Sequence, residues 1–377
     1  MRALALRSTS VFILIVMICI FWSQSVFSKD RQKKLNKSPF ELNATLMGDW
    51  DRYDNIFSDT VINNKTDSEL RRARVALKYK KSDWNLKVQV DYDESKKQFE
   101  FKDIYLSYRL VDHVSITLGQ QKEPFGLEKI NSLRRSLFIE RTIATQALAP
   151  GRNEGIAIAE EGDKWFWKLG YYRLDASKKK RHPKAVTARA GWLALKSKKL
   201  LWHFAISSSY RYLQGERYRI NERIEIHSSD SVIEGKSLKA DRVELSGAEM
   251  LFQRKAFSLV TEFMASRVKN TKGRSRRYNG NYWQLGYRIT GESHQYKMGK
   301  FGGIKPSSSL GAWELTYRES EMKLKKEQQS VQVKTYGINY YLNDSTKVMF
   351  NFLNVENNDG GVLTKGRAYA ARFQYSF

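Results

Sequence analysis

Arginine and lysine residues stand at alternate positions in several segments of the chain, where their side chains could bind anions. They share one face of each segment with other polar residues, and apolar residues occupy the opposite face. The basic residues on the polar faces are Arg72, Arg74, Lys87, Arg109, Arg189, Arg211 and Arg318, and the acids on the same faces are Asp103 and Glu314. A guanidinium offers a planar fork of N–H donors to an oxyanion, so a row of such groups can replace water around a partly dehydrated anion. The two acids could hold arginines in place or tune the affinity.

The alternation itself predicts β-strands. The apolar face of residues 72–80 consists of Ala73, Val75, Leu77 and Tyr79. Residues 84–92 alternate in the same way, and three residues between the two segments are enough for a hairpin turn. The pattern recurs in residues 103–110, 186–192, 202–211, 311–318 and 369–377. Because no segment has the period of an amphipathic helix of four turns, the chain is expected to be all-β.

The composition limits the class of protein. The chain has 377 residues and a net charge of +26, from 66 Lys and Arg against 40 Asp and Glu. Hydrophobic residues make up 41% and aromatic residues 13%, which is too rich for a disordered basic tail. One Cys cannot form a disulfide scaffold or a cysteine-ligated zinc site. The basic excess indicates an anionic partner, which could be nucleic acid, a membrane surface or a small anion.

The first 28 residues have the layout of a secretory signal peptide. Two arginines precede an apolar run from Val11 to Trp22, and Val26 and Ser28 fill the −3 and −1 positions of a cleavage site. The run is shorter than the roughly 20 residues that a spanning helix needs. Removing residues 1–28 takes away two arginines and no acid, which leaves 64 basic and 40 acidic residues, a net charge of +24, and no cysteine. Export counts against a cytosolic nucleic-acid binder, so no nucleic-acid partner is expected.

Aromatic residues favour a membrane barrel over a soluble sandwich, in which they would fill the core instead. Strand segments begin or end with Trp84, Tyr92, Trp165, Tyr171, Trp192, Trp202, Tyr212, Trp283 and Tyr317, as in the aromatic girdles of membrane barrels. The last segment ends in Phe377, which resembles the signal by which bacterial outer-membrane barrels are recognised for assembly, so the barrel-assembly machinery is an expected partner. The 349 residues after Ser28 allow 16 strands of about 22 residues each with their connections, although 14 or 18 stay open.

Seven short stretches, in order and spread over most of the mature chain, carry a family resemblance. They are Phe101–Leu106, Leu118–Glu128, Phe138–Arg141, Ala149–Gly155, Tyr287–Glu292, Gly311–Leu315 and Tyr336–Asn343. Together they resemble the phosphate-selective porin O and P family of outer-membrane channels. The resemblance implies residues 29–377 as one transmembrane antiparallel β-barrel of 16 strands in the bacterial outer membrane. It also implies a homotrimer, an inward loop that narrows the pore, and a basic lining that passes phosphate or polyphosphate.

Residues 123–155 fit such a constriction loop. They break the alternation, contain Pro124 and Gly126, and are too long for a hairpin turn. The basic residues in or beside this segment are Lys122, Lys129, Arg134, Arg135, Arg141 and Arg152. Such a channel needs no cofactor and no metal, and each ion must bind weakly enough to move on to the next site.

Three functions stay open at this point. The first is an anion-selective porin for phosphate, and the second is a general or differently selective pore whose basic residues lie in loops. The third is a non-conducting barrel that binds lipopolysaccharide or another partner at the surface, and outer-membrane lipid is an expected contact in every case. An enzyme is not expected, because five scattered histidines form no H-E-x-x-H arrangement and the chain has no P-loop or G-x-S-x-G elbow.

Overall fold

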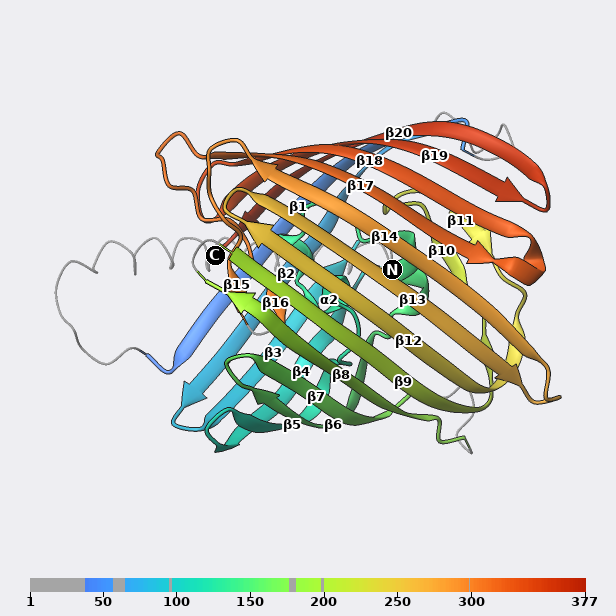
Figure 1. The fold of residues 1–377 in the computed structure, drawn as a ribbon, viewed down its shortest axis with the longest axis horizontal. Coiled ribbons are helices and arrows are strands. Elements are labelled where there is room, and N and C mark those ends of the chain that lie inside the picture. Colours follow the sequence, from blue (N-terminus) through green and yellow to red (C-terminus); the bar gives the residue numbers. More distant parts are fainter. Residues whose placement is uncertain (1–37, 57–64, 95–96, 176–180, 198–199, 298) are drawn as a thin grey trace, which may run out of the picture. The chain divides into compact units, whose positions relative to one another are not determined.

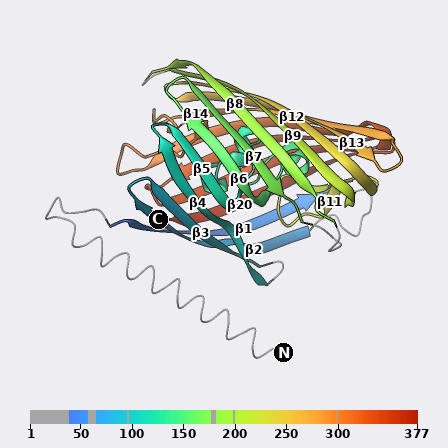
Figure 2. The ribbon, with the colours of Figure 1, turned by 90° about the horizontal axis from the view of Figure 1, so that it is seen from below.

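The wall of the molecule is a sheet that closes on itself (Figures 1 and 2). The computed structural model describes residues 38–56, 65–94, 97–175, 181–197, 200–297 and 299–377, and the predicted signal peptide, residues 1–28, lies outside them. Sixteen strands pair antiparallel with their neighbours, and β1 pairs with β20 to close the ring. The prediction of a 16-stranded antiparallel β-barrel is therefore confirmed.

The barrel strands follow one another around the wall in chain order. They are β1 Phe40–Asp54, β2 Lys65–Lys81, β3 Trp84–Asp93, β4 Gln98–Val111, β5 Val114–Lys122, β6 Arg152–Glu161, β7 Trp165–Arg173, β8 Lys184–Lys196, β9 Leu200–Tyr218, β12 Leu238–Arg254, β13 Phe257–Asn270, β14 Ser275–Arg288, β17 Ala312–Leu324, β18 Gln329–Tyr341, β19 Thr346–Asp359 and β20 Val362–Ser376. Two short sheets lie between barrel strands, formed by β10 Asn221–Arg223 with β11 Ser231–Glu234 and by β15 Tyr296–Lys297 with β16 Lys300–Phe301. The short helices of the described chain are α2 Leu127–Ile130, η2 Leu133–Arg135, α3 Ile143–Leu148 and η3 Lys325–Glu327.

The two faces of the wall have the polarity of a membrane barrel. On β9, for example, the large apolar side chain of Ile206 is exposed on the outside, whereas Ser207 and Ser209 are buried. Successive side chains of a strand point to opposite faces, so this arrangement puts the apolar row toward lipid and the polar row toward the lumen. Within the described part of the chain, no helix has the length and apolar character needed to cross a membrane.

An aromatic belt surrounds the end of the barrel that carries both termini of the wall. Trp84 and Trp165 are the first residues of β3 and β7, and the ring of Trp165 stacks on Trp192 of β8 with centroids 5.6 Å apart. On the other side of the barrel Trp313 stacks on Tyr340 at 4.3 Å. Tryptophan and tyrosine side chains favour the membrane–water interface, so this belt marks one such boundary.

The connections differ in length between the two ends. At the end with the termini, two residues separate β2 from β3, β4 from β5, and β12 from β13. At the opposite end, residues 123–151 connect β5 to β6 and residues 219–237 connect β9 to β12. Bacterial barrels have short periplasmic turns and longer extracellular loops, so the end opposite the termini corresponds to the extracellular side.

Three connecting segments lie inside the barrel. Residues 123–151 contain α2, η2 and α3, residues 219–237 contain β10 and β11, and residues 289–311 enter from the end with the termini and contain β15 and β16. Each segment hydrogen-bonds to inward-facing side chains of the wall, as the contacts described below show. The sequence pattern predicted only the first of them.

A β-bulge changes which residues of β2 face the lumen. Leu70 and Arg71 together lie opposite Gly48 of β1, because the pairing shifts from Met47–Arg72 to Asp49–Glu69. An extra residue reverses the alternation, so Arg71 and Arg72 both point inward. Arg71 binds Glu140 of the segment 123–151, with Nε 2.7 Å from Oε1, and Arg72 binds Asp91 at 3.3 Å.

The seam where the barrel closes carries a buried ion pair. Arg372 of β20 donates from Nε and Nη2 to the two carboxylate oxygens of Asp49 on β1, both at 2.6 Å. Its Nη2 also donates to Glu140 at 2.9 Å, so one guanidinium joins the seam to the segment 123–151. Truncating Arg372 would leave the buried carboxylate of Asp49 without its cation and would leave Glu140 with Arg71 alone.

We expect the substitution Arg372→Met to lower the free energy of unfolding by about 3–5 kcal/mol, as when one partner of a buried ion pair is removed. Urea titration of the barrel in lipid vesicles, followed by tryptophan fluorescence, measures this change. Arg367→Met removes an exposed cation from the same strand and serves as the control. Equal unfolding midpoints for the two variants would contradict a structural role for the seam.

Candidate functional site in the lumen

A buried glutamate on the wall holds the start of the helix α2. Glu262 of β13 accepts hydrogen bonds from the backbone N–H groups of Leu127 and Glu128 at 2.8 and 2.7 Å. The hydroxyl of Tyr282 on β14 donates to the same carboxylate. The first N–H groups of a helix have no partner within the helix, so this side chain satisfies them and ties the segment to the wall across the lumen from β5.

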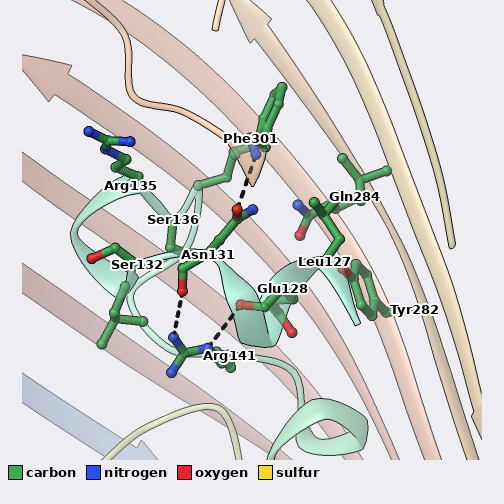
Figure 3. Close-up of a pocket in the computed structure, with 13 residues that line it drawn as sticks. Leu127, Glu128, Asn131, Ser132, Arg135, Ser136, Arg141, Tyr282, Gln284 and Phe301 are labelled. Atoms are coloured by element: carbon green, nitrogen blue, oxygen red, sulfur yellow. Dashed lines mark hydrogen bonds between the residues drawn. The ribbon is translucent and has the colours of Figure 1, made fainter. Parts of the chain in front are cut away.

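Two of the predicted anion-binding cations hold the other end of α2. Lys122 donates from Nζ to the carbonyl oxygens of Lys129, Ile130 and Asn131 at 2.7, 2.9 and 3.0 Å. Arg141 donates to the carbonyl oxygens of Glu128 and Asn131 at 3.1 and 3.0 Å (Figure 3). The last carbonyl groups of a helix attract cations. Lys122 and Arg141 therefore shape the segment.

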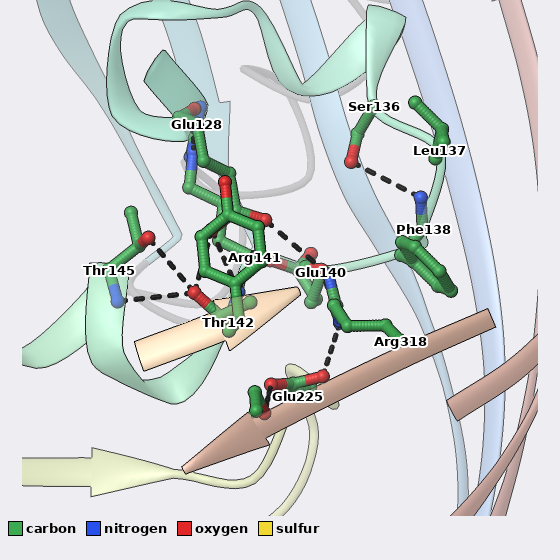
Figure 4. Close-up of polar contacts among 12 residues, drawn as sticks. Glu128, Ser136, Leu137, Phe138, Glu140, Arg141, Thr142, Thr145, Glu225 and Arg318 are labelled. Atoms are coloured by element: carbon green, nitrogen blue, oxygen red, sulfur yellow. Dashed lines mark hydrogen bonds and ion pairs between the residues drawn. The ribbon is translucent and has the colours of Figure 1, made fainter. Parts of the chain in front are cut away.

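Arg318 belongs to a buried network that joins the two extracellular-side segments (Figure 4). Its guanidinium donates to the carboxylate of Glu225, to the carbonyl oxygen of Glu140 at 3.1 Å and to Glu128 at 3.4 Å. It also lies over the ring of Phe138, 4.1 Å from the centroid. With Nη1 and Nη2 bound to protein groups and its side chain buried, Arg318 has an internal structural role.

Glu140 of this network is held in its charged form. Burial alone would raise the pKa of its carboxyl group, but Arg71 and Arg372 outweigh burial and keep that pKa below its usual range. The carboxylate accepts from Arg71 at 2.7 Å and from Arg372 at 2.9 Å. Glu140 therefore links β2, β20 and the segment 123–151 through charge.

The segment 289–311 is attached to the wall by two histidines and two buried glutamates. His203 on β9 bridges Glu249 at 2.8 Å and the hydroxyl of Tyr296 at 2.6 Å. Arg189 also binds Glu249 and donates to the carbonyl oxygen of Gly299 at 3.0 Å. The predicted site residue Arg189 is therefore buried in an ion pair.

The second attachment of the same segment uses the predicted acid Glu314. His294 lies 2.7 Å from Glu314 through Nε2 and 3.0 Å from the carbonyl oxygen of Gly302 through Nδ1. Glu314 also accepts from the hydroxyl of Tyr341 at 2.8 Å. Farther along the segment, the N–H of Phe301 donates to Asn131 at 3.0 Å (Figure 3), so the segments entering from opposite ends touch inside the barrel.

On the wall formed by β2, β3 and β4, the cations outnumber the carboxylates that bind them. Asp91 binds both Arg72 and Arg74, and Asp103 binds both Lys87 and Arg152. Each carboxylate is thus shared by two cations, and each trio keeps one net positive charge. Arg211 lies on β9 and binds Glu123 at 2.8 Å, and Lys129 lies on the helix α2.

A cavity of about 310 Å³ lies beside this part of the wall. Seven cations line it, and none of its lining residues is an aspartate or glutamate. The cations are Arg72, Arg74, Lys78, Lys87, Arg134, Arg135 and Lys300. We call this space the basic cavity. Five of these seven residues were predicted from the sequence, whereas Lys78 and Lys300 were not.

Arg134 and Arg135 also line a second cavity of about 210 Å³, together with Lys305 and Lys347. In the described part of the chain, no carboxylate lies within ion-pair distance of either arginine. The backbone carbonyl of Arg134 accepts from Gln374 of β20 at 3.0 Å, which fixes this part of the segment against the wall. The two arginines therefore form a shared boundary between the cavities.

The remaining predicted cation, Arg109, lies apart from both cavities. Its side chain is exposed near the end of β4, with Nε 3.8 Å from Asp83 of the adjacent turn. Among the described residues, no three His, Cys, Asp or Glu side chains form a group that could hold a metal ion.

Comparison with known proteins identifies relatives of the whole barrel. The family model of phosphate-selective porin O and P matches residues 40–377. Porin O of Pseudomonas aeruginosa is 24% identical over 394 aligned residues, which cover 90% of this chain and 88% of that protein.

Two solved structures show the same fold at low sequence identity. An anion-selective porin from Comamonas acidovorans superimposes with a TM-score of 0.61 at 10% identity, covering 90% of this chain and 100% of that one. The trimer form of OmpT, an outer membrane protein of Vibrio cholerae, gives a TM-score of 0.58 at 10% identity, covering 90% and 99% of the two chains.

We expect Glu262→Ala to release the start of α2, because the N–H groups of Leu127 and Glu128 lose their acceptor. Trypsin should then cleave the folded barrel after Lys129, Arg134 or Arg135 at least about tenfold faster, since local opening exposes these bonds. Gel analysis with mass spectrometry of the fragments measures the rate. Glu321→Ala removes an acid that pairs with Lys323 on the wall and is the control. Unchanged cleavage would contradict the role of Glu262 as an anchor.

Proposed function

Because the chain belongs to the phosphate-selective porin O and P family, we propose that it conducts anions across the bacterial outer membrane, with phosphate or polyphosphate as the favoured solute. The chain is an outer-membrane porin of this family. What we propose for it is the selectivity for anions and the role of the lumen cations in producing that selectivity. The observation that carries it is the basic cavity, which has seven cationic residues and no carboxylate residue in its lining.

The charge balance around the basic cavity suits a permeating anion. Asp91 and Asp103 orient four cations but neutralise only half of their charge. A phosphate entering a narrow passage loses part of its hydration, and fixed N–H donors replace those water contacts. Arg72, Arg74 and Lys87 can therefore attract an anion while their carboxylate partners keep the binding weak enough for release.

Arg134 and Arg135 can bind an anion as it moves from the basic cavity to the second cavity. They line both cavities, and neither forms an ion pair with a described carboxylate, since Asp344 of the second cavity pairs with Lys305 at 3.5 Å. An anion that leaves the basic cavity would meet these two guanidiniums before it reaches Lys305 and Lys347 of the second cavity. Conduction needs several such sites of moderate affinity.

The segment 123–151 is the proposed constriction, since residues 152–155 of the predicted loop 123–155 belong to β6. Its helix α2 hydrogen-bonds to β13 on the opposite wall, and Asn131 binds the segment 289–311 from the other end of the barrel. These contacts leave the passage to the side of β2 and β3. The trimer form of the similar OmpT barrel supports assembly of this chain as a homotrimer, and Phe377 at the end of the last strand is the proposed recognition element for the assembly machinery.

The double substitution Arg134→Gln/Arg135→Gln tests the proposed path. We expect the phosphate concentration that halves the chloride current to rise at least about tenfold, because two charge-assisted hydrogen-bond donors are lost. Single-channel recording in planar bilayers measures the block. Arg173→Gln/Arg367→Gln removes two exposed wall cations and is the matched control.

An unchanged phosphate block in the Arg134/Arg135 variant would contradict this path. An open channel that phosphate does not block even in the unsubstituted protein would favour a general pore. A folded barrel without measurable current would favour the surface-binding alternative.

We expect the titration of Lys129, on the helix α2 of the proposed constriction, to make the anion selectivity depend on pH. Burial, followed by the positive charge of Arg141, lowers the pKa of Lys129 to about 8. Its ammonium group is therefore present below pH 8 and lost above it. Raising the pH from about 7 to about 9 should reduce the anion preference measured as a reversal potential in a KCl gradient. Lys129→Gln should show a lower preference at pH 7 and a smaller change with pH, and an identical pH profile would contradict the role of Lys129.

A further inference from the structure

A second concentration of positive charge lies at the extracellular end of the hairpin formed by β13 and β14. Residues 267–277 contain six arginines and lysines and no acid. Five of the six are exposed, namely Arg267, Lys269, Lys272, Arg274 and Arg277. We call these five residues the hairpin cluster. The sixth, Arg276, binds Glu327 of η3.

The wall residues of the hairpin cluster point away from the lumen. Ser266, Val268 and Tyr278 are buried on the inner face, and they alternate with Arg267, Lys269 and Arg277 on the outer face. Arg267 and Arg277 are direct cross-strand partners. Like charges opposite each other destabilise a sheet, so a bound anion would stabilise this pair.

The described part of the protein does not supply that anion. No ion pair or side-chain hydrogen bond joins a carboxylate to any member of the hairpin cluster, although Glu244 of β12 lies opposite Arg267 in the register. Some other exposed cations of the wall do have partners, as Lys365 does with Glu356 at 2.9 Å and Arg173 with Glu154 at 2.8 Å. The hairpin cluster is therefore a local excess of charge.

The depth of the hairpin cluster in the membrane follows from the strand below it. The outward residues of β13 from Phe257 to Ala265 include Leu259 and Phe263, and this stretch of nine residues matches the 9–11 residues that cross the hydrocarbon layer. Arg267 is the next outward residue, so it reaches the level of the lipid headgroups on the extracellular side. Cations at this level attract anionic lipid.

We propose that the hairpin cluster binds the phosphate groups of lipid A, the phosphorylated glycolipid anchor of lipopolysaccharide in the outer leaflet. Arginines offer bidentate hydrogen bonds to phosphate, and Lys272 and Arg274 in the turn can contact a second phosphate beyond the strand ends. The proposal rests on the placement of the barrel in the outer membrane and is independent of what passes through the lumen.

The test compares lipid A binding by the full-length, detergent-solubilised protein and by Arg267→Gln/Arg274→Gln/Arg277→Gln. Native mass spectrometry follows titration with bis-phosphorylated lipid A and with lipid A whose phosphates have been removed. The control variant, Lys334→Gln/Lys365→Gln/Arg173→Gln, removes three exposed cations that pair with acids. We expect at least about tenfold weaker binding of bis-phosphorylated lipid A by the hairpin variant and little change in the control.

Equal binding by the hairpin variant and the unsubstituted protein would overturn the proposal, as would equal binding of phosphorylated and dephosphorylated lipid A. A heat-dependent shift in gel mobility verifies that each variant is folded, and Arg274→Glu in the exposed turn provides a second test with a single change. Chloride current and phosphate block should be unchanged in the hairpin variant, because its residues face away from both cavities. A loss of phosphate block in the hairpin variant would show that the hairpin cluster is not independent of the anion path in the lumen.

Discussion

A charged side chain in the wall of a membrane barrel can point only toward the lumen or lie at a headgroup boundary. The strand pleat enforces this choice at every second residue, and a strand has no other face on which to solvate a charge. In this protein the constraint gathers arginines, lysines and acids in one narrow space. The structure of the lumen then depends on how those charges pair, and the pairing differs between its two sides.

On the side of β8 to β20, buried carboxylates pair with buried cations. Arg318 with Glu225, Arg189 with Glu249, and Arg372 with Asp49 fix the three inserted segments against the wall. On the side of β2 to β6, two carboxylates are shared among four cations, and Arg134 and Arg135 form no ion pair with a described carboxylate. We propose that the ion pairs on the first side position the segments and that the excess of cations on the second side supplies the positive potential that attracts anions.

The strands of the wall could be predicted from the sequence because apolar and polar residues alternate within each strand. This alternation is visible without knowing which strands pair with one another. Arg72, Arg74 and Lys87 lie where the alternation places them. The predicted loop 123–155 was recognisable as irregular, but its last four residues are the start of β6. The bulge opposite Gly48 prevents the same prediction for Arg71, since one extra residue reverses the face to which the side chain points.

The partners of Arg189 and Arg318 come from segments more than 50 residues away, so their burial could not be inferred from alternation. Lys300 lies in a segment without regular period, and only its unusual length and glycine content, with Gly299, Gly302 and Gly303, could have suggested an irregular insertion.

The central claim is that unbalanced positive charge in the lumen makes this porin selective for anions. The most direct measurement is the reversal potential of the unsubstituted, refolded protein in a planar bilayer under a KCl gradient, followed by addition of phosphate. The account predicts a reversal potential of the sign set by chloride and a chloride current that phosphate reduces at millimolar or lower concentration. A reversal potential of the sign set by potassium would contradict the account, because the cations of the basic cavity would then have no influence on the permeating ion.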